Sequence, residues 1–362
     1  MKKELYLGIM SGTSLDGVDV ALCEIDKNYT RLITSYEHPF DPSLKREILK
    51  TIEHGSSLKS MGELDVKLAL LFADAIHKLL SKTALSATDI TAIGLHGQTL
   101  WHEPKSDYPF SMQLGNANVI VAQTNIATIA DFRGADIANG GEGAPFAPAF
   151  HKEVFAKQNK NIAVVNIGGM ANITILTDSS HGWDIGCGNV LMDAFMQKSR
   201  KKSYDKDGAF AKSGTINMLL LQNMLQDPYF TKEPPKSTGR EYFNLKWLEK
   251  YCKNFQNIPD ADLQRTLLEL TATTIANSVN RAQVQELILC GGGAKNSFLV
   301  ERLQSLCRCQ VTKSDAYNID SDFLEAMLFA WLAYKRIHKE PVALKNITGA
   351  QKDTILGALY LP

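Results

Sequence analysis

The sequence is poor in cysteine and has no long hydrophobic run. It contains 6 cysteines in 362 residues and no CxxC pair, and Cys307 and Cys309 are too close together for a tetrahedral zinc knuckle. We therefore expect free, mostly buried thiols of a reducing cytoplasm rather than a disulfide framework. No apolar stretch approaches the roughly 18 residues that a membrane span needs, and residues 1–4 lack the pattern of a secretory signal.

An excess of charge is also missing, because 39 Lys and Arg residues balance 39 Asp and Glu residues. A nucleic-acid-binding surface needs a basic excess or stripe, so we expect no nucleic-acid partner. The hydrophobic fraction of 44% is that of a globular protein, and the length suits two α/β domains rather than one core.

Two hairpins with small residues in their turns, at residues 5–22 and 162–176, are the most informative pattern. Each consists of an apolar strand, a turn of small and polar residues, and a second apolar strand. Gly-rich turns let backbone N–H groups approach an anion, so both turns are candidate phosphate sites. Because each hairpin opens an α/β half, we expect a nucleotide between two related domains. The candidate residues are Gly12, Thr13, Ser14, Leu15, Asp16, Gly17, Val18 and Asp19 in the first hairpin, and Asn166, Gly168 and Gly169 in the second.

The acidic residues of the first turn, Asp16 and Asp19, are unsuited to direct contact with phosphate. A carboxylate beside a phosphate-binding turn is suited to holding Mg²⁺, often through water. We expect Asp16 to take this role. A plain hairpin with a polar tip is the alternative interpretation of the same residues.

A third glycine-rich turn, Gly291, Gly292 and Gly293, follows the expected strand at residues 287–290 and precedes a helix. It lacks the GxGxxG spacing of a dinucleotide site, and no GxxxxGK[ST] motif occurs in the chain, which disfavours a Rossmann dehydrogenase and a Walker-type kinase. The three glycines would let an adenosine approach the backbone closely.

Asp184 is the candidate general base. It precedes a flexible Gly-x-Gly loop at residues 186–188, and a carboxylate there can accept a proton from a hydroxyl or a water. The alternative is an Asx-turn or a helix N-cap, but Asn189 lies closer to the helix expected at residues 190–198 and fits the cap role better. The sequence therefore favours a functional Asp184.

Polar residues around an aromatic ring suggest a sugar site. His96, Gln98 and Thr99 precede Trp101, and sugar hydroxyls need hydrogen-bond donors while sugar rings pack on aromatic faces. Arg133 can bind a substrate carboxylate through two hydrogen bonds, and an internal Arg–Asp ion pair is the alternative interpretation.

Glu325 lies on an otherwise apolar helix expected at residues 322–336, where it is either a partnered structural acid or a substrate-binding residue. A Gly- and Pro-rich stretch near residues 134–148 indicates a domain boundary. We expect an N-terminal domain at residues 1–135 and a C-terminal domain at residues 136–349, with the last strand, about residues 350–362, a candidate to return to the first domain. Further helices are expected at residues 64–79, 262–279 and 297–306.

Together these residues resemble the actin, Hsp70 and sugar-kinase superfamily and, more narrowly, the anhydro-N-acetylmuramic acid kinases. The resemblance implies an α/β, two-domain actin-like ATPase (ribonuclease H-like) fold with the nucleotide in the interdomain cleft. The matching stretches follow one another along nearly the whole chain, at residues 8–17, 96–98, 131–133, 140–145, 166–172, 184–189, 234–242, 291–293 and 325–326.

The resemblance also implies a reaction. ATP, with Mg²⁺, phosphorylates O6 of 1,6-anhydro-N-acetylmuramic acid while water opens the anhydro bridge, and the product is N-acetylmuramic acid 6-phosphate for cell-wall sugar recycling. Asp184 falls on the family's base, and the resemblance suggests a cytoplasmic homodimer. Another sugar or acyl-phosphate kinase of the same superfamily, and an actin-like filament protein, are the alternatives.

Overall fold

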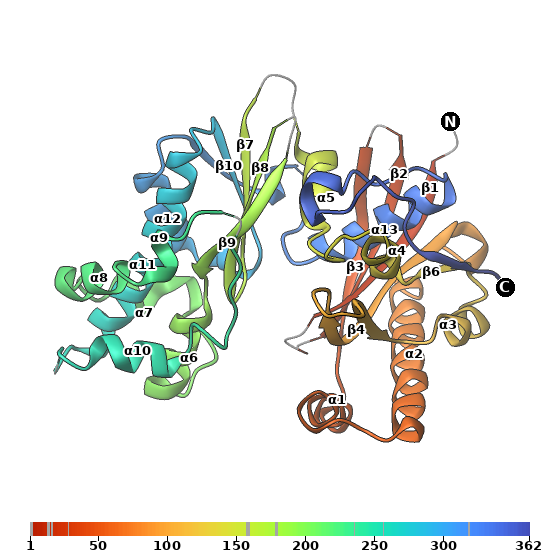
Figure 1. Ribbon diagram of the computed structural model, residues 1–362, viewed down its shortest axis with the longest axis horizontal. Helices are drawn as coiled ribbons and strands as arrows, with labels where there is room; N and C mark the ends of the chain where they lie inside the picture. The colour runs from red at the N-terminus through yellow and green to blue at the C-terminus, as the bar shows by residue number, and fades with distance from the viewer. Residues whose placement is uncertain are drawn as a thin grey trace. The chain divides into compact units, whose positions relative to one another are not determined.

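The computed structural model describes residues 3–12, 15, 17–27, 29–156, 160–177, 180–234, 236–255, 257–317 and 319–362. Three expected nucleotide-site residues, Thr13, Ser14 and Asp16, lie outside these residues. The chain forms two compact units (Figure 1): unit 1 comprises Met1–Val154 with Phe323–Pro362, and unit 2 comprises Phe155–Asp322.

Unit 1 is built on a mixed sheet that contains both parallel and antiparallel pairs. The first hairpin is antiparallel and pairs Ser11 with Val18, whereas β1 is parallel to β4 and β4 is parallel to β6. The order is β12-β6-β4-β1-β2-β3, with β5 on β4, so the final strand lies in the first sheet. The strands are β1 (Glu4–Ser11), β2 (Gly17–Asp26), β3 (Tyr29–Pro39), β4 (Ala92–Glu103), β5 (Phe110–Leu114), β6 (Thr128–Ala130) and β12 (Ala358–Tyr360).

The helices of unit 1 follow from their apolar spacing and their caps. The predicted helix at residues 64–79 is confirmed within a longer helix, whose N-cap Ser57 accepts a hydrogen bond from the Ser60 N–H. Its residues Leu64, Leu68 and Phe72, each four positions apart, are buried. The helices are α1 (Pro42–His54), α2 (Leu58–Leu80), α3 (Ala117–Thr124), α4 (Phe132–Ala138), α5 (Ala147–Phe155), α13 (Leu324–Ile337) and α14 (Lys345–Thr348), with a 3-10 turn at Ala87–Asp89.

Helix α13 lies directly on the sheet of unit 1, which is why residues 323–362 belong to this unit. A Cβ atom on Gly8 would lie 1.8 Å from the Ala326 carbonyl oxygen, and one on Gly94 would lie 1.9 Å from that of Phe329. Only glycine permits this approach of helix and strand backbones. The boundaries between the two units therefore differ from the expected boundaries at residues 135 and 349. Contacts between segments distant in the chain decide which residues belong to unit 1, and the Gly- and Pro-rich stretch does not.

Unit 2 repeats the strand arrangement of unit 1. Its sheet has the order β11-β10-β7-β8-β9, with an antiparallel hairpin β7–β8, a third antiparallel strand β9, and two parallel strands beyond β7. In unit 1 the corresponding order is β6-β4-β1-β2-β3. This repeated ribonuclease H-like order confirms the expected actin-like α/β fold. The strands are β7 (Ile162–Ile167), β8 (Met170–Leu176), β9 (His181–Cys187), β10 (Glu286–Cys290) and β11 (Gln310–Lys313).

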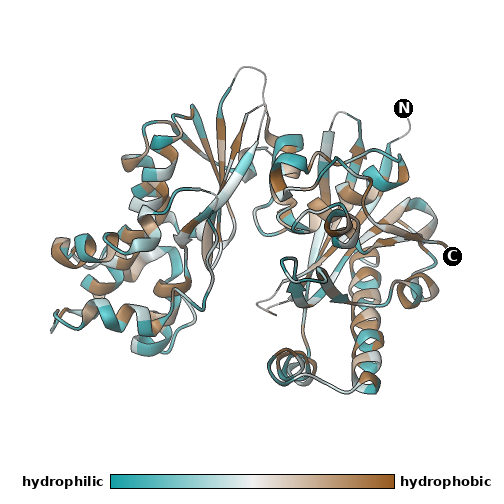
Figure 2. Cartoon of the chain, viewed as in Figure 1, coloured by the Kyte–Doolittle hydropathy of each residue, from teal (hydrophilic) through white to brown (hydrophobic). Residues whose placement is uncertain are grey.

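Figure 2 shows hydrophobic residues on the strands and the longer helices of unit 2. Its core joins strand residues such as Val165 and Leu289 to helix residues such as Leu268 and Ile275. The predicted helices at residues 190–198, 262–279 and 297–306 are confirmed. The helices are α6 (Val190–Arg200), α7 (Ala209–Lys212), α8 (Met218–Leu225), α9 (Pro228–Thr231), α10 (Leu245–Cys252), α11 (Asp260–Arg281) and α12 (Ser297–Leu306), with 3-10 turns at Lys206–Gly208, Gly292–Lys295 and Ser314–Tyr317. Within the described part of the chain, no helix is both long and apolar enough to span a bilayer.

Buried His151 on α5 should make the stability of the protein depend on pH. Its side chain is 2% exposed, and burial lowers its pKa to about 3 from an ordinary value near 6.5. The His151 side chain of the unfolded chain therefore binds a proton as the pH falls through about 6.5, whereas that of the folded chain binds one only near pH 3. The contribution of neutral His151 to the free energy of unfolding is thus present above about pH 6.5 and is lost as the pH falls below it.

We expect the free energy of unfolding to fall by about 2 kcal/mol more in the natural protein than in His151→Gln between pH 7.5 and pH 5, at about 1.36 kcal/mol per pH unit below 6.5. Urea denaturation of both proteins at the two pH values measures this difference. Parallel losses of stability in the two proteins would contradict the assignment.

Candidate functional site

Many of the predicted site residues lie near the carboxyl ends of the parallel strands of each sheet, whereas Asp184 lies on the antiparallel strand β9 and Glu325 on α13. In unit 1 these are the ends of β1, β4 and β6, and in unit 2 they are the ends of β7 and β10. Ligands of α/β proteins bind at this edge, where strands end and loops begin. Each unit therefore carries its own set of candidate residues.

At the end of β1, the Ser11 hydroxyl donates a 2.5 Å hydrogen bond to Gln98 Oε1, and both side chains are buried. Gln98 thus supports the start of the first turn, and any effect on a ligand passes through Ser11. The Gly12 carbonyl accepts a hydrogen bond from the Leu15 N–H, and Leu15 has a left-handed backbone with φ of 54°. Leu15 is buried, so it can offer a ligand only its backbone groups.

The remaining residues of the first hairpin belong to the start of β2. Gly17 pairs with Pro39, Val18 with Ser11 and His38, and Asp19 with Met10 and Glu37. The Val18 side chain is fully buried in the core of unit 1, so this residue too can approach a nucleotide only through its backbone.

Buried His96 and partly buried Arg133 form a pair in unit 1. Arg133 Nη2 lies 2.9 Å from His96 Nε2, and the imidazole packs against Phe329 with ring centroids 4.7 Å apart. Burial, assisted by the Arg133 charge, lowers the pKa of His96 to about 3, so the ring is neutral at neutral pH. Because a guanidinium only donates, Nε2 must accept, and the ring proton lies on Nδ1.

The alternative of an Arg133–Asp ion pair is not realised. Asp131 accepts a hydrogen bond from the Gly134 N–H as the cap of α4, and buried Asp136 accepts from the Gly143 N–H and the Thr348 hydroxyl. Both carboxylates are therefore used for structure, and Arg133 is turned toward His96.

Arg133 keeps hydrogen-bonding capacity for a ligand. Its Nε is buried and has no hydrogen-bond partner in the described structure, and such a donor normally finds one. Glu325 influences it electrostatically without an ion pair between them within 4.0 Å. Surrounding protein atoms raise the pKa of the Glu325 carboxyl, and the charge of Arg133 acts in the lowering direction. The Glu325 residue nevertheless remains accessible to solvent.

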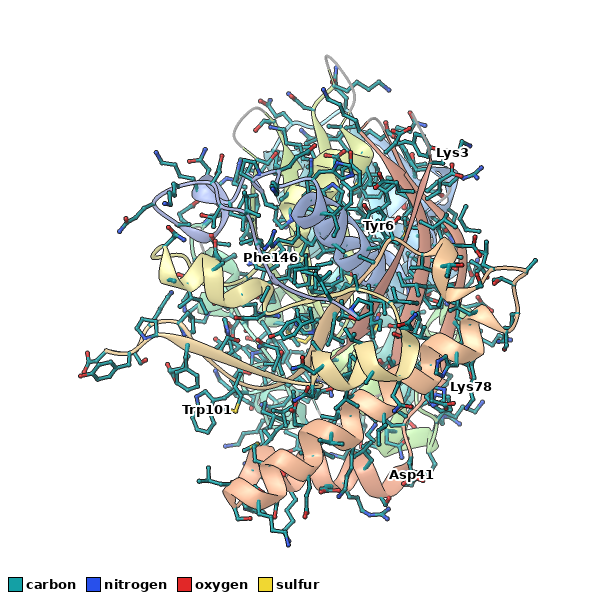
Figure 3. All side chains as sticks on the ribbon, turned by 90° about the vertical axis from the view of Figure 1, so that its right-hand side faces the viewer. Lys3, Tyr6, Asp41, Lys78, Trp101 and Phe146 are labelled. Atoms are coloured by element: carbon teal, nitrogen blue, oxygen red, sulfur yellow. The ribbon has the colours of Figure 1, made fainter. Side chains whose placement is uncertain are left out.

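Thr99 and Trp101, also expected at the sugar site, have different surroundings. Thr99 accepts a 3.3 Å hydrogen bond from Gln113 on β5, and Trp101, labelled in Figure 3, is 55% exposed. His102 Nδ1 lies 2.9 Å from the Ser111 hydroxyl oxygen. In the described part of the chain no three His, Cys, Asp or Glu side chains gather as a metal site.

In unit 2, the second hairpin turn and the three-glycine turn lie side by side. Asn166 pairs with Cys290 in the parallel strands β7 and β10. A Cβ on Gly291, whose φ is +78°, would lie 2.1 Å from Asn166 Oδ1, and one on Gly293 would lie 2.3 Å from Ile167 Cγ2. Two turns predicted separately to bind phosphate and adenosine are thus neighbours, with Gly292 exposed between the other two glycines.

Asn189 ties the start of α6 to the tip of the second hairpin, formed by Gly168 and Gly169. Asn189 is the N-cap residue of α6, as predicted, but its side chain makes no capping hydrogen bond, because Nδ2 donates instead to the Ile167 carbonyl at 3.2 Å. The Asn189 N–H donates to the Gly168 carbonyl, and the Val190 N–H donates to the Gly169 carbonyl. These bonds hold the hairpin tip against the amino end of α6.

Asp184 is held on β9 by its backbone and by one carboxylate oxygen. Its N–H donates to the Lys236 carbonyl, its carbonyl accepts from the Tyr229 hydroxyl at 2.8 Å, and Oδ2 accepts from the Thr238 N–H at 3.0 Å. Oδ1 makes no hydrogen bond with any described residue. Burial raises the pKa of this carboxyl against the lowering effect of the Thr238 N–H.

The segment at residues 236–240 is the part of the site that sequence reasoning missed. Residues 199–245 carry no regular pattern, and only the resemblance at residues 234–242 gave a signal. Besides contacting Asp184, this segment brings Arg240 to the hairpin tip, where a Cβ on Gly169 would lie 3.7 Å from Arg240 Nε and Nη2.

Comparison with known proteins gives one consistent result. A family model described as anhydro-N-acetylmuramic acid kinase matches residues 4–362. The chain is 52% identical over 365 residues to the anhydro-N-acetylmuramic acid kinase of Sulfurimonas denitrificans, covering 99% of each, and 52% identical over 363 residues to that of Sulfurovum sp., covering all of both. Among solved structures, the chain is similar to a ROK family glucokinase from Streptomyces griseus in complex with glucose and AMPPNP. The two sequences are 11% identical and the TM-score is 0.43, and the match covers 91% of this chain and 99% of that chain.

Proposed function

Because the chain belongs to the anhydro-N-acetylmuramic acid kinase family, we propose that Asp184 is the general base of its reaction. The protein is an ATP-dependent kinase that opens the 1,6-anhydro ring of anhydro-N-acetylmuramic acid and phosphorylates O6. The products are N-acetylmuramic acid 6-phosphate and ADP, and the reaction belongs to the recycling of murein sugars.

The chemistry of the substrate decides what the base must do. The anhydro sugar has no free 6-hydroxyl, so the bridging oxygen itself attacks the terminal phosphorus of ATP. As the bond between this oxygen and the anomeric carbon breaks, a water adds to that carbon and must lose a proton. We assign the acceptance of that proton to Asp184, which later releases it to solvent.

The hydrogen bonds of Asp184 are the observation that supports this role most directly. The Thr238 N–H fixes Oδ2, while Oδ1 makes no hydrogen bond in the described structure and can accept one from water. Burial raises the pKa of the carboxyl, which makes the carboxylate a stronger base than an exposed aspartate. Asp184 lies in the same unit as the carboxyl ends of β7 and β10, where the proposed nucleotide-binding turns lie.

The nucleotide site is proposed from the three glycine-containing turns. The triphosphate is assigned to Gly12–Asp19 and to Asn166, Gly168 and Gly169, whose backbone groups can approach an anion. Adenosine is assigned to Gly291, Gly292 and Gly293. The contact between these glycines and β7 supports one continuous nucleotide site at that edge of unit 2.

Mg²⁺ is proposed to accompany ATP, with Asp16 as its protein ligand. The described residues contain no cluster of three acidic or imidazole side chains, and Mg²⁺ in kinases needs only one or two carboxylates besides phosphate oxygens and water. When bound, Mg²⁺ would offset negative charge on the phosphates.

The sugar side is proposed to include His96, Gln98, Thr99, Arg133 and Glu325. Arg133 is assigned to the substrate carboxylate, because its Nε lacks a partner and a guanidinium binds a carboxylate through paired hydrogen bonds. His96 and Glu325 position Arg133, and Gln98 acts through Ser11. A cytoplasmic location is supported by the six cysteines, all of which are free thiols. A homodimer is proposed from the family resemblance alone.

Turnover in heavy-oxygen water tests the proposed reaction. Incubation with ATP, Mg²⁺ and the anhydro sugar should place one heavy oxygen on the anomeric carbon of the product and none in its phosphate. Mass spectrometry of the product and its fragments measures this, with unlabelled product kept in the same water as the control for exchange. A product without label, or with label in the phosphate, would refute the water step.

A further inference from the structure

We propose that Arg240 contacts the terminal phosphoryl group of ATP and stabilises it during transfer. The inference rests on the proposed function, since it requires that the hairpin tip at Gly168 and Gly169 faces the phosphates. Arg240 lies outside every turn that the sequence analysis assigned to the nucleotide.

The position of the guanidinium supports this contact. A Cβ on Gly169 would have Arg240 Nε and Nη2 as its nearest neighbours, both at 3.7 Å. A methyl group added to Gly169 would thus be in van der Waals contact with the guanidinium, which lies beside the turn expected to hold phosphate. A phosphate oxygen bound to the hairpin tip would be within reach of the guanidinium N–H groups.

Arg240 has its hydrogen-bonding groups available. The side chain is exposed, and it makes no hydrogen bond and no ion pair within 4.0 Å to any residue that the structure describes. It interacts electrostatically with Asp193 on α6: burial raises the pKa of that carboxyl to about 6, and the Arg240 charge acts in the lowering direction. A guanidinium has five N–H donors in a planar fork that matches phosphate oxygens.

The chain on both sides of Arg240 is fixed. On the amino side, the Lys236 carbonyl and the Thr238 N–H bind Asp184. On the carboxyl side, the Tyr242 hydroxyl donates to buried Asp227 at 2.7 Å, and Phe243 is fully buried.

One short segment therefore holds the proposed base at one end and presents a cation to the phosphate turn at the other. A donor fixed in advance, where negative charge spreads over the oxygens of the transferred group, costs little reorganisation during the reaction.

Arg240→Ala and Arg240→Lys test the contact, with Arg308→Gln as the matched control. Arg308 is also an exposed arginine of unit 2, but it precedes β11 at the opposite end of the parallel strands. We expect Arg240→Ala to lower kcat by about 10²-fold, as for the loss of one fixed donor to a developing charge. Arg240→Lys should fall between this variant and the natural protein, and added guanidinium should restore part of the Arg240→Ala activity. Arg308→Gln should leave kcat unchanged.

Nucleotide binding gives a readout that a merely structural role would not produce. We expect Arg240→Ala to bind the non-hydrolysable ATP analogue AMPPNP about 10-fold more weakly than the natural protein while its affinity for ADP stays unchanged. Equal losses for AMPPNP and ADP, or no loss for either, would overturn the proposal.

Thermal unfolding checks that the variants are folded. If Arg240→Ala does not fold, Arg240→Lys is used for the test instead. The binding comparison also separates the two hypotheses. If the natural protein fails to turn over the anhydro sugar, the proposed function falls, whereas the AMPPNP-to-ADP comparison still decides the role of Arg240.

Discussion

Replacing Asp184 by Asn should lower turnover by about 10²- to 10⁴-fold while leaving ATP binding intact, because a general base supplies an acceleration of this size. Asn has nearly the same shape as Asp, and its side-chain oxygen can still accept the Thr238 N–H, so the local structure should persist. The amide cannot take a proton from water. The defect should therefore appear in kcat and not in the affinity for the nucleotide.

Steady-state kinetics with ATP and the anhydro sugar, together with calorimetric titration of ADP, measure the two quantities. Asp260→Asn is the matched control, because Asp260 is an exposed aspartate at the start of α11 in the same unit. Burial raises the pKa of Asp184, so the acidic limb of the natural enzyme's kcat profile should lie above the ordinary pKa of an aspartate. A loss of turnover below tenfold would exclude Asp184 as the base.

Replacing Gly94 by Ala should destabilise the protein by about 3 kcal/mol, the upper end of the range for overpacking a core. The added methyl would lie 1.9 Å from the Phe329 carbonyl oxygen and 3.2 Å from the Ala333 side chain, so α13 would have to move away from β4. Phe329 packs on His96, and Glu325 lies on the same helix. The same displacement should therefore weaken the binding of the sugar.

Gly62→Ala is the matched control for this prediction. Gly62 lies on the exposed face of α2, and a methyl group added there would have no atom within 4 Å, so alanine should stabilise the protein by about 0.5–1 kcal/mol. Urea denaturation of the two variants and the natural protein measures both changes. If Gly94→Ala is no less stable than Gly62→Ala, the close approach of α13 to the sheet is wrong.

Local patterns of the sequence predicted much of the fold. Apolar strands around small, polar turns predicted the hairpins β1–β2 and β7–β8, and apolar residues three or four positions apart predicted α2 and α11. These features depend on residues close together in the chain, where hydrophobic periodicity and turn chemistry act directly. The position of Asp184 before a Gly-x-Gly loop was recognisable for the same reason.

Contacts between distant residues could not be predicted in this way. Asn189 fits the pattern of a helix cap, yet its side chain binds the Ile167 carbonyl of another strand. Arg133 has acidic neighbours in sequence, but both are engaged elsewhere and it pairs with His96. In each case the local partner was plausible, and packing of the sheet brought a different group within hydrogen-bonding distance.

By itself, the sequence determined the two hairpins, the main helices, the glycine-containing turns and the aspartate proposed as base, because each depends on neighbours a few residues away. Only the tertiary structure decided that α13 belongs to unit 1, that Gly291 lies against β7, and that Arg240 lies over Gly169. These contacts join residues separated by tens to hundreds of positions. Their partners are chosen by which backbones can approach one another closely, and no local pattern records that choice.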